Sequence, residues 1–319
     1  MRLLAAALLL IAAPGCGGGS GGTPASGAGS TGEASGPVVA SITVPARPCG
    51  VTAGEDLVWV SSFSDDELVS IDPTSNEPRG SAVPVGDRPC GVVAGAGALW
   101  VEIFGKSRVD RVDPVARKVV ARIPVGLEAW DIAYGGGSVW CSNAGDGTVS
   151  RIDPATDRVV STIETGGSPA NLRFGLGALW VGSRDGQAIF RIDPASETVE
   201  RIPVGQEGPD SIALTDDAVW AISRGDGVVV RLDAATRAVE ARIDVGTHPI
   251  VGVAAADGSV WIPNQGDDTV SRIDPATNRV TGTYQVGSGP TIVNPAFGNL
   301  WVTGFQGTTV TRLDPDRAS

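Results

Sequence analysis

The side chains best suited to bind a ligand occur at one recurring place in this sequence, nine to thirteen residues before regularly spaced tryptophans. Basic, acidic, amide and aromatic groups are all represented there, together with the only histidine of the chain. The candidate residues are Arg47, Arg88, Glu128, Trp130, Asp131, Asn171, Asp210 and His248. Polar groups that converge beside an aromatic ring are typical of a ligand site. Alternatively, these side chains only satisfy the backbone of irregular loops, and the sequence leaves both interpretations open.

Seven tryptophans set the spacing of the chain, and successive ones lie 40 or 41 residues apart. They are Trp59, Trp100, Trp140, Trp180, Trp220, Trp261 and Trp301. An aspartate follows each of them by thirteen residues, and an arginine follows six of them by eleven, with Ser70 as the exception. One period, residues 168–206, contains four short segments that predict strands, separated by turns such as Arg-Asp-Gly. Four strands in a period near 40 residues are typical of a propeller blade.

We therefore predict an all-β fold, a seven-bladed β-propeller of four-stranded antiparallel blades over residues 38–314, followed by a tail at 315–319. The last copy ends after its third strand, and residues 38–45 match the missing fourth strand. That segment would close the ring, because an open ring leaves unpaired sheet edges. Each repeated tryptophan is expected to fill space between blades. The connections that differ between copies should then converge on one face, around the mouth of the central channel, and carry the candidate residues.

The segment GALWVGSRDGQAIFRIDPASETVERIPVG at 177–205 and its sister copies resemble the YVTN-type propeller repeat of YncE-like proteins, over essentially the whole predicted propeller. Related repeats occur in virginiamycin B lyase, and the resemblance implies the fold more strongly than any activity. The lyase family is metal-dependent and uses more than one histidine, whereas this chain has His248 alone. A metal-dependent lyase is therefore the alternative function. The single histidine argues against it, because a carboxylate does not readily replace a base poised near neutral pH.

The resemblance to YncE-like proteins also implies single-stranded DNA binding as a second alternative. The net charge of −12 argues against it, because nucleic-acid binding relies on a basic surface that contacts phosphates. We therefore expect no nucleic-acid partner.

Residues 1–16 resemble a bacterial lipoprotein signal, in which Arg2 precedes an apolar run and small residues lead up to Cys16. We predict lipidation of Cys16, with ordinary secretory cleavage as the alternative. Residues 17–37 are rich in glycine and serine and predict a flexible linker. The protein would then be an exported monomer, anchored by its lipid on the extracytoplasmic side of the bacterial cell envelope.

Two further cysteines, Cys49 and Cys90, stand at equivalent positions in adjacent repeats. Export permits a disulfide between them, but equivalent side chains in a rotationally symmetric ring point in the same sense rather than toward each other. The pairing is left open, and Cys141 is expected to be a small buried residue. We predict no cofactor and no metal site. Aspartate-rich turns such as 64–67 leave weak binding of a divalent cation as the alternative, although none has EF-hand spacing.

The function that these observations favour is that of a non-catalytic binding module tethered to the envelope. Its ligand or partner would be a small molecule, a glycan or another envelope protein, bound at the rim of the central channel.

Overall fold

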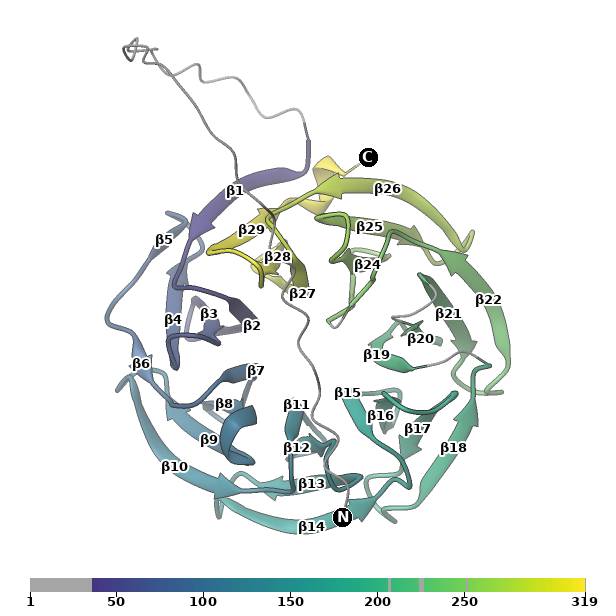
Figure 1. Cartoon of the computed structure of the whole chain (residues 1–319), viewed down its shortest axis with the longest axis horizontal. Helices are drawn as coiled ribbons and strands as arrows, with labels where there is room; N and C mark the ends of the chain where they lie inside the picture. The colour runs from purple at the N-terminus through teal and green to yellow at the C-terminus, as the bar shows by residue number, and fades with distance from the viewer. Residues whose placement is uncertain (1–35, 206–207, 224–226, 251, 319) are drawn as a thin grey trace, which may run out of the picture. The chain divides into compact units, whose positions relative to one another are not determined.

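The computed structural model describes residues 36–205, 208–223, 227–250 and 252–318. These residues form seven antiparallel sheets arranged as blades around a central channel (Figure 1). We number the blades in chain order from the sheet that begins with β2 (Pro48–Gly54). In blade 1 the outermost position is shared by two short strands, and every other blade has four strands. The predicted seven-bladed all-β propeller is thus confirmed.

Each blade runs outward from the channel. The innermost strands after β2 are β7 (Pro89–Gly95), β11 (Ala129–Gly135), β15 (Pro169–Gly175), β19 (Pro209–Leu214), β23 (Ala254–Ala256) and β27 (Pro290–Ala296). The second strands are β3 (Leu57–Ser62), β8 (Ala98–Ile103), β12 (Ser138–Asn143), β16 (Ala178–Ser183), β20 (Ala218–Ser223), β24 (Ser259–Asn264) and β28 (Asn299–Gly304). The third strands are β4 (Glu67–Asp72), β9 (Arg108–Asp113), β13 (Thr148–Asp153), β17 (Ala188–Ile192), β21 (Val228–Asp233), β25 (Thr269–Asp274) and β29 (Thr309–Leu313). The outermost strands are β5 (Glu77–Pro78) with β6 (Val83–Pro84), β10 (Lys118–Pro124), β14 (Arg158–Glu164), β18 (Val199–Pro203), β22 (Val239–Asp244), β26 (Arg279–Gln285) and β1 (Val38–Thr43).

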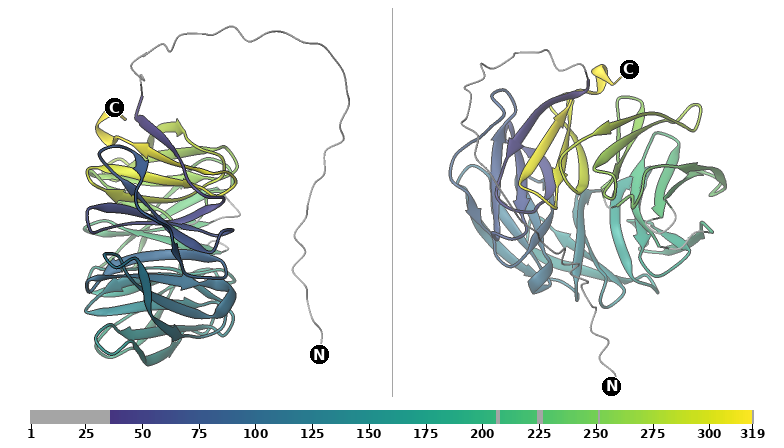
Figure 2. Two further views of the ribbon diagram at one scale, coloured as in Figure 1. Left: turned by 90° about the vertical axis from the view of Figure 1, so that its left-hand side faces the viewer. Right: turned by 45° about the horizontal axis from the view of Figure 1, so that its top comes forward.

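The ring is closed by the N-terminal strand, as predicted. β1 pairs antiparallel with β29, the third strand of blade 7, and supplies the outermost strand of that blade. The purple β1 and the yellow C-terminal strands lie side by side in every view (Figure 1, Figure 2). After β29 the chain forms a short 3-10 helix, η2 (Pro315–Arg317). The backbone oxygen of Ala318 then accepts a hydrogen bond of 2.9 Å from Arg272 in blade 6.

The repeated tryptophans fill the space between blades. All seven indoles are at most 1% exposed. Trp140 of blade 3, for example, packs in one cluster with Leu172 and Leu179 of blade 4. Its indole N–H donates to Gly135 O at 3.0 Å, so the buried polar group is satisfied. The expected packing role of the repeated tryptophan is therefore confirmed.

In several blades the repeated arginine links its blade to the next. The guanidinium of Arg151 lies over the Trp140 ring, 5.1 Å from its centroid, and donates to Pro194 O of blade 4 at 3.0 Å. Arg231 and Arg312 make the same contact with carbonyls of their own neighbouring blades. The repeated sequence Arg-Ile-Asp-Pro therefore supplies both partners of a contact between blades. Its arginine donates from one blade, and the backbone carbonyl of its proline accepts in the next.

Blade 1 lacks this arginine and obtains a guanidinium from its neighbour. Arg117, in the turn after β9, lies over the Trp59 ring at 4.6 Å from its centroid. Its Nη2 donates to the hydroxyl of Ser70, the residue that replaces the repeated arginine, at 3.1 Å. The tryptophan of blade 1 is therefore also covered by a cation, although this cation belongs to blade 2 rather than to blade 1 itself.

Candidate functional site

The mouth of the channel is built from the loops that enter the innermost strands and from the hairpins between second and third strands. Arg47, Arg88, Glu128 and His248 occupy corresponding places in four of these loops, with φ between 45° and 60°. Their carbonyls accept backbone hydrogen bonds from the facing hairpins, as from Phe63 N to Arg47 O at 3.1 Å. The backbone of these loops is therefore satisfied without the four side chains, which are all exposed.

The backbone at these positions is left-handed. Such a φ costs about 1–2 kcal/mol for a residue that carries a Cβ. Glycine occupies the corresponding place in two other blades, as Gly208 and Gly289 with φ of 58° and 61°. Other turns of the propeller, such as those at Asp157 and Asn278, have the same φ without glycine.

Arg47 lies between two aromatic rings at the mouth. Its guanidinium carbon is 4.3 Å from the ring centroid of Phe305 and 5.4 Å from that of Phe63. The two phenylalanine rings also meet edge to face, with their centroids 5.4 Å apart. Blades 7 and 1 thus share one cluster of a cation with two rings.

A second cluster continues around the mouth through blades 2, 3 and 4. The guanidinium carbon of Arg88 is 5.1 Å from the ring centroid of Phe104, and that of Arg184 is 3.9 Å from Trp130. The Phe104 and Trp130 rings meet edge to face, with centroids 5.9 Å apart. We call the two clusters together the arginine–aromatic rim, which consists of Arg47, Phe63, Arg88, Phe104, Trp130, Arg184 and Phe305.

Sequence reasoning missed four members of this rim, Phe63, Phe104, Arg184 and Phe305. Each of them stands four residues after a repeated tryptophan, within the hairpin between the second and third strands. A comparison of the seven copies at that position would have found them. The candidates came from the loops before the tryptophan, and in the structure backbone hydrogen bonds join those loops to the hairpins that follow it.

The aspartates of the hairpins hold the mouth loops in place. Asp65 accepts from Ala46 N at 2.8 Å, and Asp146 accepts from Leu127 N at 2.9 Å. Hydrogen bonds from Thr247 hold the pKa of Asp267 below its usual range. Within the part of the chain that the structure describes, no group of three or more histidine, cysteine or acidic side chains could hold a metal ion.

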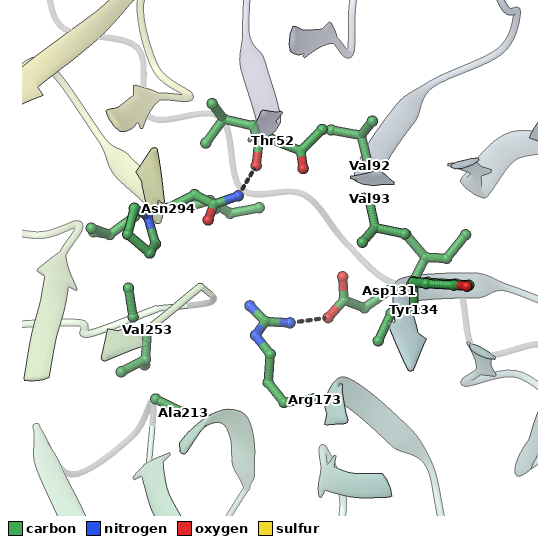
Figure 3. Close-up of a pocket in the computed structure, with 18 of the residues that line it drawn as sticks. Thr52, Val92, Val93, Asp131, Tyr134, Arg173, Ala213, Val253 and Asn294 are labelled. Atoms are coloured by element: carbon green, nitrogen blue, oxygen red, sulfur yellow. Dashed lines mark hydrogen bonds and ion pairs between the residues drawn. The ribbon is translucent and has the colours of Figure 1, made fainter. Parts of the chain in front are cut away.

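Inside the mouth, the innermost strands surround a cavity of about 370 Å³ (Figure 3). Polar and apolar atoms contribute almost equally to its wall, and the polar side chains on it include Thr52, Asp131, Arg173 and Asn294. Asp131 Oδ2 accepts three hydrogen bonds, from Asn171 Nδ2 at 2.8 Å, Leu172 N at 3.1 Å and Arg173 Nη1 at 3.1 Å. The structure therefore brings two of the predicted residues, Asp131 and Asn171, together and adds Arg173, which the sequence did not single out.

A buried carboxyl group lies behind this part of the cavity wall. Glu102 on β8 is 0% exposed, and its Oε2 accepts from Gly91 N at 2.9 Å. Burial raises the pKa of Glu102 well above its usual range, and the nearby Asp131 carboxylate adds to the effect. The corresponding residue of blade 1 is Ser61, whose hydroxyl accepts from Gly50 N and donates to Cys90 O. Oε2 of Glu102 takes over the first of these roles in blade 2.

Cys49 and Cys90 are joined by a disulfide between the innermost strands of blades 1 and 2. The pairing that the sequence left open is therefore formed, because the strands converge at the channel and bring the two Cα atoms to 5.0 Å from each other. The approach is so close that a Cβ on Gly50 would lie 2.0 Å from Cys90 O, and only glycine fits there. Cys141 is a buried free thiol, and burial raises its pKa well above the usual range.

The remaining predicted residues do not join one cluster. Asp210 is buried on β19, with 4% of its surface exposed. Glu128 and His248 are exposed at the mouth but are absent from the arginine–aromatic rim, and His248 belongs to blade 6 on another part of the ring. Cys16 lies outside the described residues. No helix in the described parts of the chain is both long enough and apolar enough to cross a membrane.

No protein-family model matches the chain, and no curated protein matches its sequence. Solved structures do match its fold. Virginiamycin B lyase from Staphylococcus aureus superposes with a TM-score of 0.76 and 17% identity, over 86% of this chain and 98% of that one. A catalytically inactive histidine-to-alanine variant of that lyase, with quinupristin, gives 0.75 and 16% identity over 86% and 98%. The WD40 β-propeller domain of Doa1 gives 0.75 and 14% identity over 89% and 99%. The likeness shows a shared seven-bladed propeller fold, which lyases and other propellers have in common.

Proposed function

We propose that this protein is a non-catalytic binding module of the bacterial cell envelope, and that its ligand or partner binds at the arginine–aromatic rim. The observation that carries the proposal is the set of exposed arginines stacked on aromatic rings where the blades differ most. A stacked guanidinium keeps N–H groups at its edge that can donate to carboxylates, phosphates or sugar hydroxyls. The ring faces and edges nearby offer apolar area, as binding surfaces enriched in arginine and aromatic residues do.

A thermal-shift screen of the full-length protein tests this proposal. The panel contains envelope glycans, small metabolites and divalent cations, and each positive compound is tested again on Trp130→Ala and Arg88→Ala. We expect at least one compound to stabilise the unmodified protein and to lose that effect in both variants. Val160→Ala is the matched control, because Val160 is 57% exposed on the outermost strand of blade 3. A compound that stabilises all variants equally would place its site elsewhere, and a silent panel would direct the search to a protein partner by pull-down.

A lyase activity is the competing proposal, and the fold shared with virginiamycin B lyase favours it. Against it stands His248, the only histidine of the chain, at an exposed position. The test is incubation with quinupristin and Mg²⁺, followed by mass spectrometry of the product. We expect no cleavage. Cleavage that is lost on chelation and in His248→Ala would replace the binding-module proposal with a metal-dependent lyase.

Anchoring at the envelope and membership of the YncE-like proteins are parts of the same proposal, supported by the lipoprotein-type start of the chain and by its repeat. We expect Cys16→Ser to move the protein from the membrane fraction to the soluble exported fraction. Recovery of the variant in the membrane fraction would contradict the lipid anchor.

A further inference from the structure

We infer that the channel cavity binds a neutral monosaccharide, whose hydroxyl groups accept hydrogen bonds from the free edge of the Arg173 guanidinium and donate to the Asn294 side chain. This site lies inside the channel, on the innermost strands, and the inference does not rest on the function proposed for the rim. Its basis is a set of polar groups that face one another across the cavity and that the protein uses only in part.

One layer of the cavity wall consists of corresponding residues from all seven blades. Each of them is paired with the repeated tryptophan on the second strand of its own blade. Thr52, Arg173 and Asn294 are the polar members, and the other four are Val93, Ala133, Ala213 and Ala254. Blade 4 lies across the ring from blades 7 and 1, so Arg173 faces Thr52 and Asn294 with the cavity between them (Figure 3). The four apolar side chains are short, which leaves room for a ligand between the polar ones.

The protein uses only one end of the Arg173 guanidinium. Its Nη1 donates to Asp131 Oδ2 at 3.1 Å and to Leu172 O at 2.8 Å. Among the described residues, Nε and Nη2 have no hydrogen-bond partner. Figure 3 shows the edge that carries these two nitrogens turned away from Asp131, toward the side of the cavity that Val253 and Asn294 form. Because the two N–H bonds form a planar fork, they can donate together to two neighbouring hydroxyl oxygens of a sugar.

The Asn294 amide provides an acceptor on the opposite wall. Its Nδ2 donates to Val51 O. Its Oδ1 accepts no hydrogen bond from the residues that the structure describes, and Figure 3 shows this oxygen on the cavity side of the amide. The hydroxyl of Thr52 makes no hydrogen bond to those residues either. Since a hydroxyl group both donates and accepts, one sugar can accept from Arg173 and donate to Asn294.

The charges of the cavity select a neutral ligand. Among the described residues that line it, only Asp131 and Arg173 are charged, and they already form an ion pair of 3.1 Å. Their side chains are 9% and 30% exposed, so an added anion or cation would bring an unpaired charge into a partly buried place, which is unfavourable. The nearby Glu102 carboxyl adds no further charge, because burial raises its pKa and favours its neutral form. A sugar uses the free N–H groups of Arg173 and leaves the ion pair intact.

The composition and size of the cavity select a single sugar unit. Polar and apolar atoms contribute almost equally to the wall. A sugar has the same mixture, because its hydroxyls lie around the edge of the ring and its C–H groups form the two faces. Val253 and Ile292 line the cavity and can pack against those C–H groups. A volume of about 370 Å³ is at the small end of the roughly 300–1,000 Å³ typical of ligand pockets, which favours a monosaccharide over a longer glycan.

Isothermal titration calorimetry of the full-length protein tests the inference with D-glucose, D-galactose, D-mannose and N-acetyl-D-glucosamine. We expect at least one of these sugars to bind. Cyclohexanol keeps a six-membered ring with a single hydroxyl, and the uronic acid of the bound sugar adds a negative charge. Both should bind at least about tenfold more weakly than that sugar.

Substitutions locate the site. Arg173→Gln and Asn294→Ala should each weaken binding of the sugar by at least about tenfold, because each leaves polar groups of the ligand without a partner. Arg201→Gln is the matched control and should bind normally, because Arg201 is exposed on the outermost strand β18. Arg184→Ala removes an arginine from the rim and should also bind the sugar normally.

Three results would overturn the inference. One is a lack of binding of all four sugars, and another is binding of cyclohexanol or the uronic acid as tight as that of the sugar. The third is unchanged affinity in Arg173→Gln with its circular dichroism spectrum retained. If affinity is lost in Arg184→Ala instead, the sugar binds at the rim, which supports the function proposed there and not the channel site. Should Arg173→Gln fail to fold, Asn294→Ala and the compounds tested on the unmodified protein still decide.

Discussion

Arginine lies over tryptophan in two regions of this propeller, and the two regions use the pair differently. Between blades, Arg151 lies over the buried Trp140 and also donates to Pro194 O, so both of its interactions hold the ring together. At the mouth, Arg184 lies over the half-buried Trp130, and its side chain has no hydrogen bond or ion pair to the residues that the structure describes. The same two residue types are thus a structural link in one region and an accessible surface in the other. What distinguishes them is whether the guanidinium edge already has a partner.

The largest expected effect on stability tests directly whether Trp140 and Trp130 differ in role. Trp140→Ala removes a fully buried indole and should lower the free energy of unfolding by about 3–5 kcal/mol. Trp130→Ala should lower it by less than about 1.5 kcal/mol, because a half-buried side chain leaves a smaller cavity. Urea unfolding followed by circular dichroism measures both. Equal losses in the two variants would mean that Trp130 is a structural residue.

Loss of the disulfide should have the next largest effect. Reduction of the Cys49–Cys90 bond, whose partners are separated by 41 residues in sequence, should lower the free energy of unfolding by about 2–4 kcal/mol. Thermal unfolding with and without a reductant measures this change. In the double variant Cys49→Ala/Cys90→Ala the reductant should have no effect. If the reductant shifts the midpoint of that variant as well, the stability change does not come from this bond.

The buried carboxyl of Glu102 should make stability depend on pH. Because its pKa is raised in the folded state, the native protein keeps this proton where the unfolded chain has lost it. Its stabilising contribution is full below the unfolded pKa, near 4.5, and is lost as the pH rises toward the folded pKa. The slope in that window is at most about 1.4 kcal/mol per pH unit. In Glu102→Gln this part of the slope should be absent.

Urea unfolding of both proteins between about pH 5 and pH 8 checks this prediction. At more acid pH, below the unfolded pKa of 3.8, Asp153→Asn is a control of opposite sign. Hydrogen bonds from its own turn lower the pKa of Asp153, so its contribution is present at neutral pH and is lost toward acid. Parallel pH profiles of the unmodified protein and Glu102→Gln would contradict a protonated Glu102.

The smallest expected effect on stability concerns blade 1, where Ser70 replaces the repeated arginine. Arg117→Ala removes the cation from Trp59 and should destabilise the protein by about 1 kcal/mol. Adding Ser70→Arg to that variant should restore most of the loss, because the other blades place their arginine there. Arg158→Ala on the exposed part of β14 is the control and should change little. A double-mutant cycle without coupling between positions 70 and 117 would show that the two sites are independent.

The fold was predictable because the repeat determines it. The spacing of Trp140 and Asp153, read seven times, indicated the blades, and residues 38–45 indicated the closing strand, observed at Val38–Thr43. The mouth was predictable only in part. Arg88 and Trp130 were found because the copies differ there, but their contact through Phe104 required the hairpin to be placed opposite the loop.

The features that sequence reasoning did not find depend on distances between blades. Arg173 was overlooked because its importance comes from Asp131, 42 residues earlier. Arg117 was overlooked for the same reason, since it replaces the arginine missing at Ser70, 47 residues earlier. A repeat alignment shows which residues correspond to one another. It does not show which side chains of different copies meet.

Closure by β1 has a consequence for the order in which the molecule can be completed. β1 precedes the other described strands of the propeller, and its partner β29 follows them. β1 must therefore wait until the strands of all seven blades have been synthesised before it can pair. During that time a strand edge is available to other chains. To avoid aggregation, the protein must therefore complete the last blade quickly.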